Sequence, residues 1–168
     1  MLNIINNLKP FCEDCYRRIN VREYARIVDI SPPTASKLLS EYCKFGLLVK
    51  EKDKNYIFYY ANKSNKNFID LSRIYWRHRL SEVIEHLDGK LIDPLVILFG
   101  SLAKAEVKAD SDIDLCVISH KKDLNLGNLE KKLKRKIQVF FFGSIREINN
   151  LELRNNILNG YILSGRIK

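Results

Sequence analysis

One stretch constrains the fold of this chain more than any other, and it runs from residue 95 to residue 119 with the sequence LVILFGSLAKAEVKADSDIDLCVIS. Its first five residues are apolar and end at Gly100, which predicts a buried strand. A bend at Gly100-Ser101 and a short helical stretch should follow, and then a second strand over residues 112–119. Because residues two apart on a strand point to the same face, we expect the side chains of Asp112 and Asp114 to project together.

Two carboxylates that project the same way repel each other unless a cation lies between them. Oxygen ligands of this kind suit Mg²⁺ or Mn²⁺, and Mg²⁺ normally also takes waters and substrate phosphates. Gly100 lets the backbone approach a phosphate closely, and Ser101 adds a hydroxyl beside the amides that open the next helix. The stretch therefore predicts a site for a metal ion and a phosphorylated ligand.

Gly100-Ser101, ten further residues and then Asp112-Ile113-Asp114 form a motif between two predicted strands. This motif resembles the signature of the DNA polymerase beta nucleotidyltransferase superfamily, specifically its minimal members, over roughly the second half of the chain. The resemblance implies a small α/β domain with a mixed sheet, in which Asp112 and Asp114 are catalytic and bind the metal. It also implies ATP or another NTP as the ligand, held by Gly100, Ser101, Leu102 (through its backbone amide) and Lys104. The alternative is a strand–turn–strand whose aspartates only cap a helix or solvate a strand end.

The chain departs from the family pattern at two positions. Active members usually carry a third carboxylate on a neighbouring strand, and here the corresponding residue is expected to be Gln138 in Lys-Ile-Gln-Val-Phe. An amide brings no charge, so a second metal ion and the activation of an attacking hydroxyl are both weakened. Ala105 stands where many minimal members have glycine, which is a milder change.

The N-terminal part of the chain predicts two helices and a hairpin. Asn20 is a suitable N-cap for a helix over residues 21–28, and Ser31-Pro32 has the cap and proline of a second helix that ends at Gly46. Two strands, residues 47–50 and 56–60, are expected to flank a charged turn.

This pattern resembles a winged helix-turn-helix of the prokaryotic regulator type, over roughly residues 1–62. The resemblance implies DNA as a partner, although winged helices also dock proteins. Small hydroxyls and lysines on the second helix and the hairpin suit contacts with phosphates and base edges, and an ordinary solvated face is the alternative. The expected DNA-binding residues are Thr34, Ser36, Lys37, Ser40, Lys44, Lys52 and Lys54.

Composition and the positions of turn- and linker-forming residues predict an α+β chain in three parts. Residues 1–62 form the winged helix-turn-helix, residues 63–90 a polar linker and a connecting helix, and residues 91–168 the nucleotidyltransferase-like domain. The connecting helix could be a spacer or part of a homodimer interface. A net charge of +9 in 168 residues points to a polyanionic partner, but the excess is spread over both halves. No apolar run reaches the length of a bilayer span, so we expect a cytoplasmic protein without a membrane partner.

Four cysteines, Cys12, Cys15, Cys43 and Cys116, complete the set of candidate ligands. Cys12 and Cys15 have half the spacing of a zinc site, but no second pair completes it, so two buried thiols are the expected state. Cys116 is expected in the core of a strand.

Two functions fit these features. The first is an enzyme that transfers a nucleotidyl group from ATP to a hydroxyl, and its resemblance to antitoxins that modify a toxin makes a protein acceptor as plausible as a small molecule. The second is a DNA-binding regulator whose C-terminal domain binds Mg-NTP with weak or lost catalysis. Gln138 favours the regulator, whereas Ser101, Asp112 and Asp114 favour at least the binding of a metal–nucleotide complex.

Overall fold

A computed structural model describes residues 2–167 of the chain, which divides into two compact units. The first unit is Met1–Tyr75 with Ala105–Ala109, and the second is Trp76–Lys104 with Asp110–Lys168. Residues 1 and 168 of the predicted domains lie outside the described part. Whether boundaries at residues 62 and 91 separate two functions stays a prediction.

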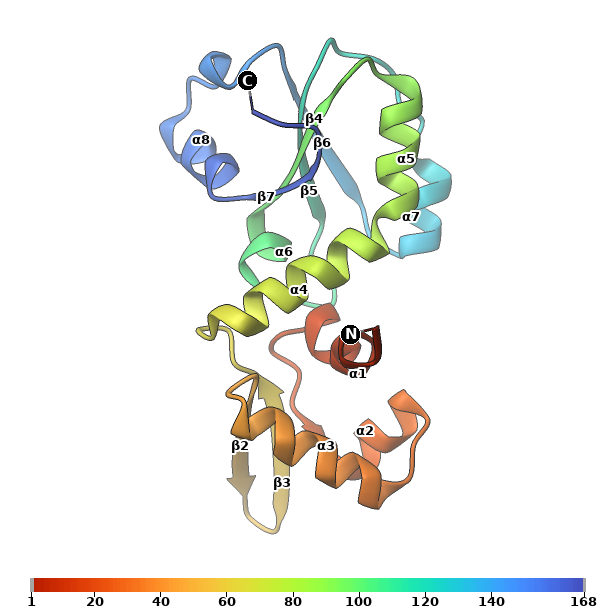
Figure 1. Cartoon of the computed structure of the whole chain (residues 1–168), viewed down its shortest axis with the longest axis vertical. Coiled ribbons are helices and arrows are strands. Elements are labelled where there is room, and N and C mark those ends of the chain that lie inside the picture. The colour runs from red at the N-terminus through yellow and green to blue at the C-terminus, as the bar shows by residue number, and fades with distance from the viewer. Residues whose placement is uncertain (1, 168) are drawn as a thin grey trace. The chain divides into compact units, whose positions relative to one another are not determined.

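The first unit combines helices with a three-stranded antiparallel sheet of order β1-β3-β2. Its elements are α1 (Leu2–Glu13), β1 (Ile19–Asn20), α2 (Val21–Val28), α3 (Pro32–Lys44), β2 (Leu48–Asp53), β3 (Tyr56–Ala61) and most of α4 (Lys66–Arg79), coloured red to yellow-green in Figure 1.

Local sequence signals explain where the helices of this unit begin. The side chain of Asn20 accepts a hydrogen bond from the amide of Glu23 and caps α2, and Ser31 caps α3 in the same way. These two predicted caps are confirmed. The two-residue strand β1 was not predicted, because a strand this short has no periodicity of its own and exists only through its pairing with β3.

The segment Ala105–Ala109 joins the first unit although it lies far along the chain. The amide of Cys15 donates a hydrogen bond to the carbonyl of Val107 at 2.8 Å, and Val107 is fully buried. Ala105, also buried, has φ of 55°, a left-handed backbone that glycine would adopt without strain.

The predicted connecting helix is in fact two helices, and the prediction of one continuous helix was wrong. The helix α4 ends at Arg79, and α5 (Ser81–Lys90) follows after Leu80, whose φ and ψ are −97° and 9°. No glycine or proline marks this break. Leu80 is fully buried, so tertiary packing sets its conformation.

The second unit is built on a four-stranded mixed sheet of order β6-β5-β4-β7, which confirms the predicted sheet type. The central strand β5 runs antiparallel to β4 and parallel to β6. Its strands are β4 (Leu95–Phe99), β5 (Ile113–Ile118), β6 (Ile137–Phe142) and β7 (Tyr161–Ser164).

Helices cover both faces of this sheet, with α8 on one side and α5 and α7 on the other (Figure 1). The helix α6 (Gly100–Lys104) follows β4 directly, and α7 (Gly127–Leu133) lies in the crossover from β5 to β6. Between β6 and β7, a 3₁₀ turn (Ile145–Glu147) precedes α8 (Leu151–Leu158). All five residues of β4 are buried, so this strand is the centre of the core.

The burial of β4 generates a stability prediction. Leu98 is fully buried, whereas Ile162 on the neighbouring strand β7 is 37 % exposed. We expect Leu98→Ala to lower the free energy of unfolding by about 2–5 kcal/mol and Ile162→Ala by about 1 kcal/mol or less. Urea titrations with unchanged slope would measure both, and equal losses would contradict this account of the core.

Candidate functional site

The two predicted acids lie at the start of β5, beside the bend that follows β4. Asp114 pairs with Phe99 on β4 and with Gln138 on β6, so these three residues form one row across the sheet. Asp112 lies just before the strand. Phe99 is buried, and its ring meets that of Phe140 edge-on with centroids 5.5 Å apart. The carboxylates therefore stand at the rim of a packed apolar surface.

Gly100 allows the bend and the Asp114 carboxylate to approach each other. Its φ is +69°, which disfavours residues with side chains. A Cβ atom at this position would lie 2.3 Å from Asp114 Oδ2, closer than two non-bonded atoms can come. Glycine is thus favoured by the backbone angle, and a side chain at this position would have to displace the Asp114 carboxylate.

Gln138 stands beside the acids, as expected for the residue that takes the place of the usual third carboxylate. Its Nε2 donates a hydrogen bond to Asp112 Oδ2 at 2.7 Å. The amide therefore holds Asp112 in place without adding negative charge. Unlike a carboxylate, it has no basic oxygen able to take up a proton at neutral pH.

The environment of Asp114 raises the pKa of its carboxyl group. Partial burial, which disfavours the charged form, is the larger cause, and the nearby negative charge of Asp112 is the second. A bound cation would relieve both effects. Among residues 2–167 no group of three or more His, Cys, Asp or Glu side chains could hold a metal ion. Two carboxylates remain, a donor set that fits Mg²⁺ when substrate phosphates supply further ligands.

Arg135 holds the loop that leads into Asp112. Its Nη1 donates to the carbonyl oxygen of Ser111 at 2.5 Å, and its guanidinium lies 5.3 Å from the centre of the Trp76 ring. This contact was missed, because nothing in the local sequence links a helix end to a loop 24 residues earlier.

The other predicted nucleotide-binding residues differ in how exposed their side chains are. Ser101 is half-buried next to Gly100, and the side chain of Leu102 is fully buried, which leaves only its backbone for a ligand. Lys104 is exposed and donates to Asn156 Oδ1 on α8 at 2.8 Å. The structure thus brings together Gly100, Asp112 and Asp114, and directs Lys104 towards α8.

The predicted DNA-binding residues all belong to the first unit, and all seven are exposed: Thr34, Ser36, Lys37, Ser40 and Lys44 on α3, Lys52 on β2 and Lys54 in the turn that follows. The inward face of α3 is buried at Ala35, Leu39 and Tyr42.

One residue near the hairpin was not singled out from sequence. Arg18 contacts the carboxylates of Glu51 and Asp53 at 3.0 and 3.5 Å. These ion pairs offset the acidic residues that alternate with the hairpin lysines.

Cys12, Cys15 and Cys116 are buried thiols, as expected, whereas Cys43 is half-buried. Cys12, Cys15 and Cys116 are at most 1 % exposed. Burial raises the pKa of Cys15 to about 11, and it raises the pKa of Cys12 further. Such thiols stay protonated at neutral pH and are poor metal ligands.

No helix within residues 2–167 has the length and apolar character needed to cross a membrane.

Comparison with known proteins gives one positive result. The family described as "Polymerase beta, Nucleotidyltransferase" matches residues 82–166, just over half of the chain. This range contains the bend, both acids and Gln138. Searches of curated proteins and of solved structures found no match.

The raised pKa of Asp114 predicts how stability depends on pH. The folded chain binds this proton more tightly than the unfolded chain, so the ionised carboxylate lowers stability above the raised pKa. Without divalent cations at neutral pH, Asp114→Asn should raise Tm by about 2–4 °C. The gain should shrink as the pH falls below the folded pKa and disappear below the unfolded pKa, where the carboxyl group is neutral in both states.

Circular dichroism melts in chelator over a pH series would measure this difference. Asp110→Asn, at an exposed aspartate of the same unit, is the matched control and should change Tm little. A lower Tm for Asp114→Asn at neutral pH would contradict the electrostatic description of the site.

Proposed function

Because the chain belongs to the polymerase beta nucleotidyltransferase family, we propose that Asp112 and Asp114 bind a divalent cation together with the phosphates of a nucleoside triphosphate. We propose further that the chain is a DNA-binding regulator in which this site binds Mg-NTP with weak or no nucleotidyl transfer. The hydrogen bond from Gln138 to Asp112 carries the second part of the proposal.

Different residues of the chain would bind the cation and the phosphates. Asp112 and Asp114 would hold Mg²⁺ or Mn²⁺, whose chemistry is to neutralise phosphate charge. The backbone at Gly100, the Ser101 hydroxyl and the Leu102 amide would contact the distal phosphates of ATP or another NTP. The raised pKa of Asp114 supports this assignment, because a carboxylate that is costly to ionise gains most from a cation.

Nucleotidyl transfer needs more than binding. The acceptor hydroxyl oxygen forms a bond to the α-phosphorus, the bond to pyrophosphate breaks, and the hydroxyl proton must go to a base. Asp112 and Asp114 would be occupied by the cation, and the amide of Gln138 cannot take the proton. Binding can therefore persist where catalysis is slow.

An active nucleotidyltransferase is the second candidate. The presence of Gly100, Ser101, Asp112 and Asp114 at the family spacing supports it. In that case water, or a group on the acceptor, would take the proton, and the acceptor would be a hydroxyl of a protein or a small molecule.

The N-terminal unit supports the DNA-binding part. Two capped helices followed by a β-hairpin fit a winged helix-turn-helix, with α3 as the helix that would enter the major groove. Exposed lysines on α3 and the hairpin would contact phosphates, and Thr34, Ser36 and Ser40 would lie nearer the bases. The net charge of +9 favours such a partner.

A pair of substitutions at Gln138 separates binding from catalysis. Labelled ATP with Mg²⁺ and a cell extract should give little or no labelled acceptor with the wild-type chain. We expect Gln138→Asp to gain transfer by about a hundredfold or more, because it adds a basic carboxylate. Gln138→Asn is the matched control, equal in size and without charge, and should gain nothing.

Asp112→Asn should abolish any nucleotidyl transfer that the chain performs. It should also abolish the rise in Tm that Mg-ATP causes in the wild-type chain. Efficient labelling by the wild-type chain, lost in Asp112→Asn, would favour the enzyme over the regulator. If Mg-ATP had no effect on the Tm of the wild-type chain, the proposed nucleotide site would be contradicted.

Single lysines test the DNA surface. With a random-sequence duplex, Lys37→Ala or Lys44→Ala should weaken binding and lower the slope of log affinity against log salt by about 1 each. Lys9→Ala, at an exposed lysine of α1, is the control with the same change in charge. Fluorescence anisotropy over a salt series measures both quantities, and identical slopes for all three variants would show that α3 is not the contact surface.

A further inference from the structure

A cavity of about 700 Å³ lies at the end of the four-stranded sheet opposite to the candidate acids, within the second unit. Its lining includes Leu95 and Ile118, which pair with each other at the start of β4, whereas Phe99 and Asp114 pair at the end of β4. These two pairs are four residues apart along β4, a distance of about 13 Å. The cavity is therefore distinct from the proposed nucleotide site.

The lining of this cavity is largely aliphatic and comes from separate segments of the chain. Its apolar side chains are Leu95 on β4, Ile118 on β5, Ile145 in the 3₁₀ turn, Leu158 at the end of α8 and Ile167 after β7. Leu158 and Ile167 are 50 % and 53 % exposed, so apolar surface remains open to solvent around the hollow. Apolar side chains gathered in this way are typical of a binding site. The volume also lies in the range of small-molecule sites, about 300–1,000 Å³.

Two arginines line the same cavity. Arg146 and Arg166 are exposed, and within residues 2–167 neither guanidinium has an ion pair or a hydrogen bond. The carboxylate of Glu147, next to Arg146 in the sequence, instead accepts a hydrogen bond from the Gly143 amide at 2.8 Å. Asp93 also lines the cavity, so its charged residues, two arginines and one aspartate, sum to +1. Guanidinium groups bind carboxylates through paired donors, which favours an anionic ligand.

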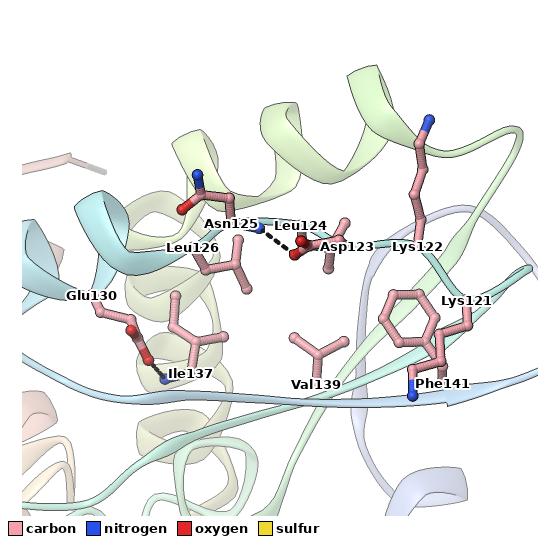
Figure 2. A pocket seen from close by; sticks show the side chains of 10 residues that line it. All are labelled: Lys121, Lys122, Asp123, Leu124, Asn125, Leu126, Glu130, Ile137, Val139 and Phe141. Carbon is pink, nitrogen blue, oxygen red and sulfur yellow. Dashed lines mark hydrogen bonds between the residues drawn. The ribbon is translucent and has the colours of Figure 1, made fainter.

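A second hollow in the same unit lacks this preference. It has a volume of about 540 Å³ and lies between β6 and the loop that leads to α7 (Figure 2). Its charged side chains sum to zero, and they are Lys121, Lys122, Asp123 and Glu130. Glu130 also accepts a hydrogen bond from the Ile137 amide at 2.9 Å. The charges of this hollow therefore identify no ligand, whereas the two arginines of the other cavity do.

We propose that the cavity beside Arg146 and Arg166 binds a small aliphatic monocarboxylate. The carboxylate would lie between the two guanidinium groups, and the aliphatic chain would pack on Leu95 and Ile118. A single negative charge matches the net charge of the lining, whereas a phosphate dianion would bring a second charge near Asp93. A nucleic acid would use the arginines but not the apolar lining.

Octanoate is the probe, and two smaller changes separate its parts. Octan-1-ol keeps the chain without the charge, and acetate keeps the charge without the chain. Calorimetric titrations measure affinity, and amide shifts of Ser144 and Ile167 in nitrogen-15 NMR spectra locate the bound probe. Arg146→Gln and Arg166→Gln each remove one guanidinium from the lining. Arg154→Gln, at an arginine of α8 outside the lining, is the matched control.

We expect octanoate to bind the wild-type chain with a Kd of about 0.1 mM, a modest affinity for about ten non-hydrogen atoms. Acetate and octan-1-ol should each bind at least about tenfold more weakly. Arg146→Gln and Arg166→Gln should each weaken octanoate about fivefold, because an exposed guanidinium contributes less than a buried one. Neither should change the affinity for octan-1-ol, and Arg154→Gln should match the wild type. The amide shifts of the wild-type chain decide the matter if a variant fails to fold.

Four results would overturn the proposal. No saturable binding up to about 10 mM octanoate, without localised amide shifts, would show that the cavity is not a ligand site. Equal octanoate affinity of the wild type, Arg146→Gln and Arg166→Gln would show that the arginines do not hold a carboxylate. Displacement of octanoate by Mg-ATP would assign the cavity to the nucleotide site. A wild-type dimer in sedimentation that Leu158→Ser converts to a monomer would show that a second copy covers the cavity.

Discussion

The Asp114 carboxylate occupies the space beside Gly100 that a Cβ atom would need, and this close approach fixes the shape of the candidate site. It depends on the pairing of Phe99 with Asp114, which in turn depends on the complete burial of β4. A slip of one residue in this register would turn Asp114 into the core and Ile113 out of it, so the apolar side chains exclude the alternative. The polar site is therefore positioned by the packing of residues that take no part in its chemistry.

Gln138 shows how one substitution can separate two properties of such a site. The amide keeps the geometry, because it donates to Asp112 where a third carboxylate would require a shared cation. The same amide removes negative charge and a proton acceptor. In the function proposed above, this residue would stabilise the site without ligand and would leave it without a carboxylate to activate a hydroxyl. The family relationship over residues 82–166 fits either function, and the proposal of binding without turnover rests on the residue at position 138.

Sequence reasoning succeeded where short-range chemistry decides the structure. The caps at Asn20 and Ser31, the strand–bend–strand around Gly100 and the paired acids all follow from neighbouring residues. It failed where distant residues decide. The break at Leu80 has no local signal, β1 exists only through β3, and the bond from Arg135 to Ser111 joins segments that the sequence keeps apart. The cavity beside Arg146 and Arg166 was also missed, because segments far apart in the chain form its lining.

The path of the chain through Ala105–Ala109 has a consequence for how the protein could have been assembled. The two halves of the Gly-Ser and Asp-x-Asp motif are joined by a loop that is built into the other compact unit, where Cys15 binds Val107. Neither unit can be excised as one uninterrupted piece of polypeptide. An evolutionary exchange of either part for an unrelated domain would have to rebuild this loop, so the two parts are constrained to change together.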